Sequence, residues 1–251
     1  MTTSGAAAAR PPERGFVSKV LVLATKDLRM EMRGRDTLPP MLAFSLAVTL
    51  LLAFSLPPDR DLRVPADIPL GAAPLGVVLS AFLWITVLFA GLIGFARTFE
   101  VEREAGAIEA LLLVPIDRTG LFLGKACANL CYVVAVEALL LPVFALLFSL
   151  ELGAGWLVLL LVTALVDIGF VAVGTLFASV AAHTRSRELM LPILALPALV
   201  PIFLAAVELT SDLLLGGGLE DVAARGWFGI LVAFDVIVGV AAALAFEYVV
   251  D

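Results

Sequence analysis

Residues 75–96 read LGVVLSAFLWITVLFAGLIGFA and contain no charged side chain. A helix needs about 20 residues to cross a hydrocarbon core that is about 30 Å thick. Only helices and closed barrels satisfy all of their backbone polar groups inside lipid. This stretch therefore predicts a transmembrane helix, and the fold class follows from how often such stretches recur along the chain.

Five further apolar segments reach a similar length, at residues 38–56, 126–149, 156–181, 189–208 and 227–249. The chain is 62% apolar and 16% charged, whereas ordinary soluble domains are about 45–50% apolar and about 25% charged. We therefore expect an all-α polytopic membrane protein with six transmembrane helices. A single transmembrane domain should occupy residues 16–251, behind a disordered tail at residues 1–15. Pro192, Pro197 and Pro201 are expected to kink or break the fifth span.

The basic residues are distributed unevenly among the segments that flank the spans. The N-terminal segment and the connections after spans two and four hold 13 Lys and Arg residues, and the alternate connections hold 3. Positively charged connections stay in the cytoplasm. We therefore expect both termini and residues 97–125 to face the cytoplasm. The net charge of −7 argues against a nucleic-acid partner.

Residues 16–35 form an amphipathic pattern before the first span. Apolar residues recur on one stripe at helical spacing, and basic residues gather away from it. The stripe holds Val17, Val20, Leu21, Ala24 and Leu28, and the basic residues are Lys19, Lys26, Arg29 and Arg33. Such a helix lies in the headgroup layer with its cations against anionic lipid. Two roles stay open for it: a surface helix only, or a link between span one and a cytosolic partner.

Three acidic residues fall inside the predicted spans and away from the span ends: Glu137, Asp167 and Asp235. A carboxylate at the bilayer centre costs about 2.5–3.5 kcal/mol on insertion scales. The six predicted spans contain no Lys or Arg to pair with these groups. We therefore expect the three side chains to be protonated, hydrogen-bonded to neighbouring helices or directed into a wet cavity. They would either line a site that senses substrate or join helices together, and both interpretations stay open.

The connection between spans two and three is charged, although two very apolar spans flank it. Residues 97–125 read RTFEVEREAGAIEALLLVPIDRTGLFLGK, in which apolar residues recur at helical spacing over 101–112. Pro115 ends this helix, since the residue before a proline resists the α region. Asp117 caps a new helix that runs into span three. A short helix held at a bend could transmit a push or a pull to both spans; the alternative is a juxtamembrane turn that shields lipid.

The string FEVEREAGAIEALLLVPIDRTGLFLGK resembles the same connection in export-type permeases of ATP-binding-cassette transporters. More closely, it resembles the haem exporter protein B family, CcmB, of cytochrome c maturation. KDLRMEMRGRD, at residues 26–36, resembles the opening helix of that family, and the resemblance covers nearly all of the chain beyond residue 15.

The resemblance implies an export-type permease of the bacterial inner (cytoplasmic) membrane. Its cytoplasmic coupling helix, between spans two and three, would dock on a separate ATPase subunit. The residues that match the motif are Glu100, Glu102, Arg103, Glu104, Gly106, Glu109, Pro115 and Lys125. Gly106 would allow a close backbone approach, and Lys125 would snorkel where span three meets the interface.

The resemblance also implies partners and an activity. The chain would be the membrane subunit of a complex with a CcmA-like ATPase and with CcmC-like and CcmD-like membrane subunits. ATP hydrolysis on the ATPase would drive release of the haem-loaded chaperone CcmE on the periplasmic side. The alternative is a permease of a related exporter for a drug, a lipid or a polysaccharide.

Catalytic and cofactor motifs are absent from the sequence. It has no H-E-x-x-H, G-x-S-x-G or G-x-x-x-x-G-K-[ST] pattern, so we expect a non-catalytic subunit whose partner binds ATP. Haem iron takes ligands such as His, Cys or Met. The one histidine, His183, lies in a predicted cytoplasmic turn, and Cys127 and Cys131 are expected to behave as small apolar residues. We therefore expect no metal site and no cofactor on this chain, with haem handled by the complex.

Overall fold

The computed structural model describes residues 15–56, 75–99, 118–150, 152–182, 184, 187–216 and 226–249. These residues form seven helices and no strand. The helices are α1 (Phe16–Gly34), α2 (Leu38–Ser55), α3 (Leu75–Arg97), α6 (Arg118–Phe148), α7 (Gly155–Ala182), α8 (Arg187–Leu214) and α10 (Trp227–Val249). The tail predicted at residues 1–15 lies outside the described residues, except for Gly15.

Six of these helices, all but α1, are long and apolar enough to cross a membrane. The prediction of an all-α polytopic membrane protein with six spans is therefore confirmed. Two helices are longer than the predicted spans. Helix α6 begins at Arg118, as predicted for the helix that follows Asp117, and runs without interruption into the span expected at 126–149. Helix α8 continues to Leu214 rather than ending at 208. Both helices continue past their apolar segment, because a backbone already in the helical conformation adds each further hydrogen bond at little cost.

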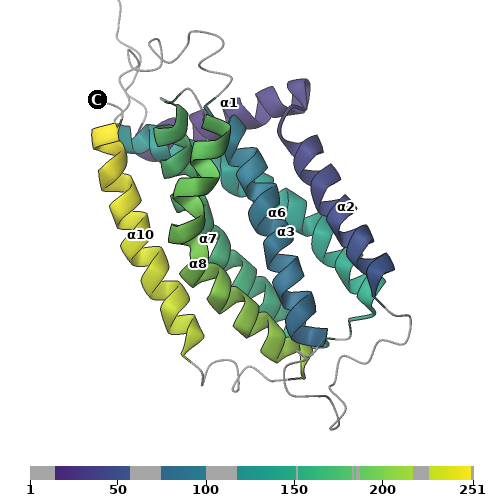
Figure 1. Ribbon diagram of the computed structural model, residues 1–251. Coiled ribbons are helices and arrows are strands. Elements are labelled where there is room, and N and C mark those ends of the chain that lie inside the picture. The colour runs from purple at the N-terminus through teal and green to yellow at the C-terminus, as the bar shows by residue number, and fades with distance from the viewer. Residues whose placement is uncertain are drawn as a thin grey trace, which may run out of the picture.

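Helix α8 is uninterrupted, although it contains Pro192, Pro197 and Pro201. Each proline removes one helical hydrogen bond, and in a membrane the neighbouring helices help to satisfy the freed carbonyl groups. The helix changes direction along its length (Figure 1). Of the two outcomes predicted for these prolines, the structure therefore shows a bend and no break.

The spans pack around α7 and α3, which carry the largest buried shares of their apolar segments. An aromatic chain crosses the core: Phe170 of α7 makes edge-on contacts with Phe95 at 4.9 Å and with Phe203 at 5.1 Å between ring centroids. Glycines make room for these rings, because a side chain at Gly91 would collide with Phe170 and one at Gly174 with Phe95. The size of the phenylalanine rings and the space left by the glycines therefore determine how closely α3 and α7 approach each other.

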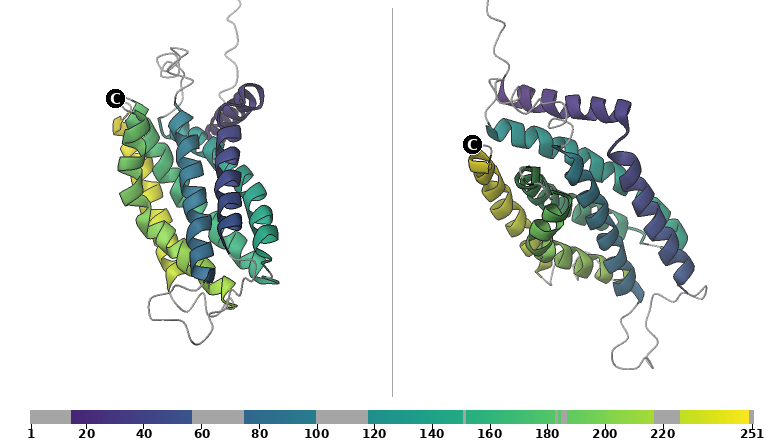
Figure 2. Two further views of the ribbon diagram at one scale, coloured as in Figure 1. Left: turned by 45° about the vertical axis from the view of Figure 1, so that its right-hand side comes forward. Right: turned by 45° about the horizontal axis from the view of Figure 1, so that its top comes forward.

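Helix α1 lies across one end of the bundle, at a steep angle to α2, and packs on α6 (Figure 2). We call this end the α1 end. The last turn of α10 lies at the same end (Figure 1). The last residues of α3 and the first residues of α6 also lie there, so the connection between these spans starts and finishes beside α1.

Candidate functional site

The candidate site lies where the connection between α3 and α6 meets the bundle. Seven of the residues predicted to touch an ATPase lie outside the described residues: Glu100, Glu102, Arg103, Glu104, Gly106, Glu109 and Pro115. The coupling helix therefore stays a prediction. The structure describes the two roots of the connection, which are Thr98 and Phe99 after α3 and the first turns of α6 from Arg118.

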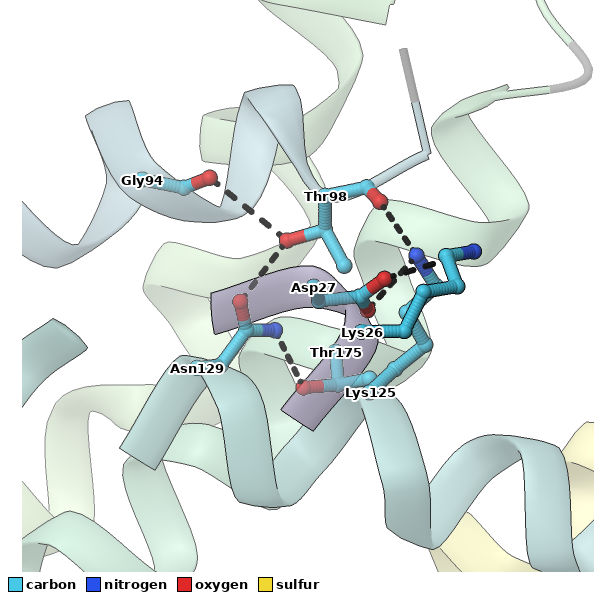
Figure 3. Close-up of polar contacts among 7 residues, drawn as sticks. All are labelled: Lys26, Asp27, Gly94, Thr98, Lys125, Asn129 and Thr175. Carbon is cyan, nitrogen blue, oxygen red and sulfur yellow. Dashed lines mark hydrogen bonds and ion pairs between the residues drawn. The ribbon is translucent and has the colours of Figure 1, made fainter. Parts of the chain in front are cut away.

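Lys125 is the centre of the site, and it points inward. Its Nζ atom lies 3.0 Å from Oδ2 of Asp27 on α1 and donates a hydrogen bond of 3.1 Å to the backbone oxygen of Thr98. The Phe99 ring centroid lies 5.5 Å from the same atom. Only 3% of the residue is exposed. One ammonium group therefore joins α1, the end of α3 and α6 (Figure 3).

The outward, snorkelling position that we predicted for Lys125 is therefore wrong. A lysine at the end of a membrane helix extends into the headgroups when nothing nearby can pair with it. Here α1 covers this part of α6 and supplies the carboxylate of Asp27, which is also buried. A close ion pair with additional hydrogen bonds replaces the lost hydration of both charges.

A second chain of hydrogen bonds continues from Thr98 into the bundle. The Thr98 hydroxyl donates to Oδ1 of Asn129 at 2.9 Å, and Nδ2 of Asn129 donates to the Thr175 hydroxyl at 2.9 Å. Asn129 follows Lys125 by one helical turn, so both face the same side of α6. Figure 3 shows the two chains side by side. Together they connect α1, α3, α6 and α7 through buried polar groups.

Helix α1 also holds the start of α2. The Glu31 carboxylate accepts hydrogen bonds from the backbone N–H groups of Leu38 at 2.8 Å and Thr37 at 3.0 Å. These N–H groups have no partner inside α2, since the first turn of a helix leaves its donors free. Glu31 therefore acts as a cap supplied by the preceding helix, which fixes the angle between α1 and α2.

The buried face of α1 differs from the predicted apolar stripe. Val20 and Ala24 are buried, but Val17 is 68% exposed and Leu21 is also exposed. The buried face continues instead through Leu23 and the two acids, Asp27 and Glu31. Neither acid was predicted, because the stripe was defined by apolar residues alone. Asp27 follows Ala24 by three residues, and Glu31 follows Asp27 by four, so both acids continue the buried stripe at helical spacing. This spacing was the signal in the sequence that could have identified them.

The cations predicted to face lipid lie on the other sides of α1. Arg29 and Arg33 are exposed, and Lys19 and Lys26 are partly exposed. Lys26 also lies 3.4 Å from Oδ1 of Asp27, next to the buried ion pair. Their contact with anionic lipid stays a prediction.

The structure brings two of the three intramembrane acids together. Glu137 of α6 and Asp167 of α7 are 5% and 1% exposed, and their side chains share a hydrogen bond. A hydrogen bond between two carboxyl groups requires a proton on one of them. Asp235 of α10 lies apart from this pair, against the backbone of Gly169, where an added Cβ would be 2.5 Å from its Oδ1 atom. Among the described residues, no three His, Cys, Asp or Glu side chains gather as metal ligands.

A family model described as "CcmB protein" matches residues 18–251. The chain belongs to the CcmB family. Two curated relatives, both named "Heme exporter protein B", are each 30% identical to it. The protein of Rhodobacter capsulatus aligns over 190 residues, which are 74% of this chain and 80% of that protein. The protein of Paracoccus denitrificans aligns over 189 residues, 74% of this chain and 79% of that protein.

A third relative with the same printed name extends the comparison. The "Heme exporter protein B" of Haemophilus influenzae is 27% identical over 192 residues, which cover 74% of this chain and 78% of that protein. The family assigned from residues 97–125 and 26–36 of the sequence is therefore confirmed.

Proposed function

We propose that this chain is the membrane permease subunit of an ATP-binding-cassette complex that acts in cytochrome c maturation. The observation that carries the proposal is the CcmB match over residues 18–251, supported by relatives that bear the name "Heme exporter protein B". ATP is hydrolysed on a separate CcmA-like subunit, and CcmC-like and CcmD-like membrane subunits complete the complex. The chain itself is not an enzyme.

The α1 end faces the cytoplasm in this proposal. The 13 basic residues that flank this side, against 3 on the other, support the orientation. The connection at residues 100–117 then lies within reach of a cytosolic ATPase. Its anionic residues, Glu100, Glu102, Glu104 and Glu109, together with Arg103, Gly106 and Pro115, form the docking surface.

The buried network can transmit a displacement of this connection to the membrane spans. A displacement of the connection acts first on its roots, Thr98 and Lys125, which are hydrogen-bonded to each other. Because Lys125 is paired with Asp27 and Thr98 is bonded to Asn129, the same displacement moves α1, α3 and α6 together. The far ends of these spans then shift on the periplasmic side, where the haem-loaded chaperone CcmE is released.

In this proposal, the intramembrane acids hold neighbouring helices together, so that the helices move as a unit. The hydrogen bond between Glu137 and Asp167 holds α6 to α7 at a depth where no water competes for it. Asp235 fits into the notch that Gly169 leaves on α7 and positions α10 there. We assign these three residues a joining role, which leaves the haem path to the complex as a whole.

Co-purification with the ATPase tests the docking part of the proposal. Replacing Glu102 and Glu104 with Lys should reduce recovery of the ATPase subunit by at least about tenfold, because it reverses two charges on the docking surface. The matched control is the same change at two acids of a predicted outer connection, Asp59→Lys and Asp61→Lys. Equal recovery from the Glu102/Glu104 variant and the wild type would remove the docking claim.

Deletion of the gene tests the pathway. We expect c-type cytochromes to disappear while b-type haem proteins persist, and a plasmid copy of the gene should restore the c-type signal. Unchanged c-type haem staining would contradict the proposal and would favour a related exporter with a drug, lipid or polysaccharide as its cargo.

A further inference from the structure

A cavity of about 310 Å³ opens at the α1 end, between α1, the start of α2, the end of α3 and α6. Its volume lies at the lower limit of small-ligand pockets, which begin at about 300 Å³. The polar network of Figure 3 forms part of its wall, through Asp27, Thr98, Lys125 and Asn129. The coupling role proposed above makes no use of this space.

Apart from Glu31, whose carboxylate caps the start of α2, three charged residues of the wall take no part in the network. Arg33 comes from α1, Arg97 is the last residue of α3, and Asp36 lies in the turn between α1 and α2. Within the described parts of the chain, neither arginine has an ion-pair partner or a side-chain hydrogen bond. By contrast, Lys125 and Asp27 pair with each other deeper in the wall. The cavity therefore offers two unused guanidinium groups and one carboxylate.

In the proposed membrane orientation, the cavity lies at the level of the lipid headgroups. Arg97 follows directly on the apolar segment of α3, so its guanidinium group stands where the hydrocarbon core ends. Helix α1 lies across the ends of the spans at the same level (Figure 2). Met30 and Ala128 add apolar wall between the charged groups. At this depth the most abundant anionic group is the phosphate of a phospholipid.

We propose that this cavity binds the headgroup of a phospholipid that carries both a phosphate and a primary ammonium group, such as phosphatidylethanolamine. Arg33 and Arg97 bind the phosphate, for which the planar guanidinium group supplies paired donors. Asp36 accepts hydrogen bonds from the ammonium group. Met30 and Ala128 contact the glycerol carbons. Choline headgroups lack N–H donors for Asp36, and glycerol headgroups lack the positive charge.

Native mass spectrometry of the purified membrane complex tests the proposal. The complex is incubated with equal amounts of phosphatidylethanolamine and phosphatidylglycerol, and the retained lipid is counted. We expect the wild type to retain mainly phosphatidylethanolamine. One basic residue near a membrane surface contributes about fivefold to lipid affinity, so Arg33→Ala with Arg97→Ala should weaken retention about 25-fold. Asp36→Asn should remove the preference between the two lipids while retention of phosphate-bearing lipid persists.

The matched control is Arg35→Asn, which removes an exposed arginine that lies outside the cavity wall and outside the predicted lipid-facing set, and which keeps a residue that tolerates the positive φ found there. This variant should retain lipid as the wild type does. The proposal is overturned if Arg35→Asn loses as much lipid as the double variant, or if the wild type retains both lipids equally. Displacement of the retained lipid by inorganic phosphate would assign the site to a soluble phosphate and would equally overturn it. Because Arg33 and Arg97 are exposed, we expect both variants to fold, and circular dichroism of the same samples checks this.

Discussion

Replacing Lys125 with Met should destabilise the protein far more than replacing Lys26, although both lysines approach Asp27. The substitution leaves the Asp27 carboxylate buried beside an apolar side chain. Removing one partner of a buried ion pair costs about 3–5 kcal/mol. Lys26 lies 3.4 Å from the other oxygen of Asp27 and compensates in part, so we expect the lower value of about 3 kcal/mol.

The matched control is Lys26→Met. The Lys26 side chain is 39% exposed, compared with 4% for Lys125, so solvent screens its charge. Exposed ion pairs contribute about 0.2–1 kcal/mol, and the control should stay within this range. Unfolding with sodium dodecyl sulfate in mixed micelles, followed by circular dichroism, measures both variants against the wild type.

A double-mutant cycle separates the ion pair from general packing. Asp27→Asn combined with Lys125→Met removes both charges, and uncharged replacements of a buried pair are often neutral. We therefore expect the double variant to be more stable than Lys125→Met alone. The reasoning is refuted if the two single changes simply add, or if Lys125→Met and Lys26→Met differ by less than about 0.5 kcal/mol.

Three further predictions concern the interior of the bundle. Gly174→Ala should destabilise the fold by about 1–3 kcal/mol, because its methyl group collides with the Phe95 ring; unchanged detergent unfolding would contradict the packing described. Asn129→Leu should cost about 1–3 kcal/mol, since it removes the hydrogen-bond partner of the buried Thr175 hydroxyl and the bond to the partly buried Thr98, and an exposed-face change such as Leu146→Ala serves as the comparison in the same assay. Glu137→Gln keeps a hydrogen-bonding group opposite Asp167 and should change stability by less than about 1 kcal/mol, whereas Glu137→Leu should cost more; equal effects would argue against the shared hydrogen bond.

The spans could be predicted because lipid imposes a simple requirement on the sequence. Each crossing needs an uninterrupted apolar helix, so each of the six spans, including residues 75–96, can be recognised from its own sequence alone. Helix ends are less constrained. The start of α6 at Arg118 agrees with the helix predicted to follow Asp117, but the packing of its first turns against α1 joins segments far apart along the chain, and no local pattern in the sequence indicates that contact.

The sequence indicated several residues of the candidate site but not the residues that they contact. Lys125 and the acids Glu137 and Asp167 were singled out one at a time, from their residue type and their position in an apolar run. Their partners are determined by which helices pack together. The contacts of Lys125 with Asp27, and of Asn129 with Thr175, join residues far apart along the chain. Periodicity describes one helix at a time, so it gave Asp27 no role, and the position of Lys125 at the end of a span indicated the headgroups.

The ion pair of Lys125 and Asp27 also sets an order of events during synthesis. Asp27 leaves the ribosome well before Lys125, so α1 is complete while the surface that receives it does not yet exist. Until α6 has entered the bilayer, the Asp27 carboxylate lacks its buried partner, so α1 stays at the water boundary. The first of the described helices to be made can therefore reach its final position only after the third of the six spans has been inserted.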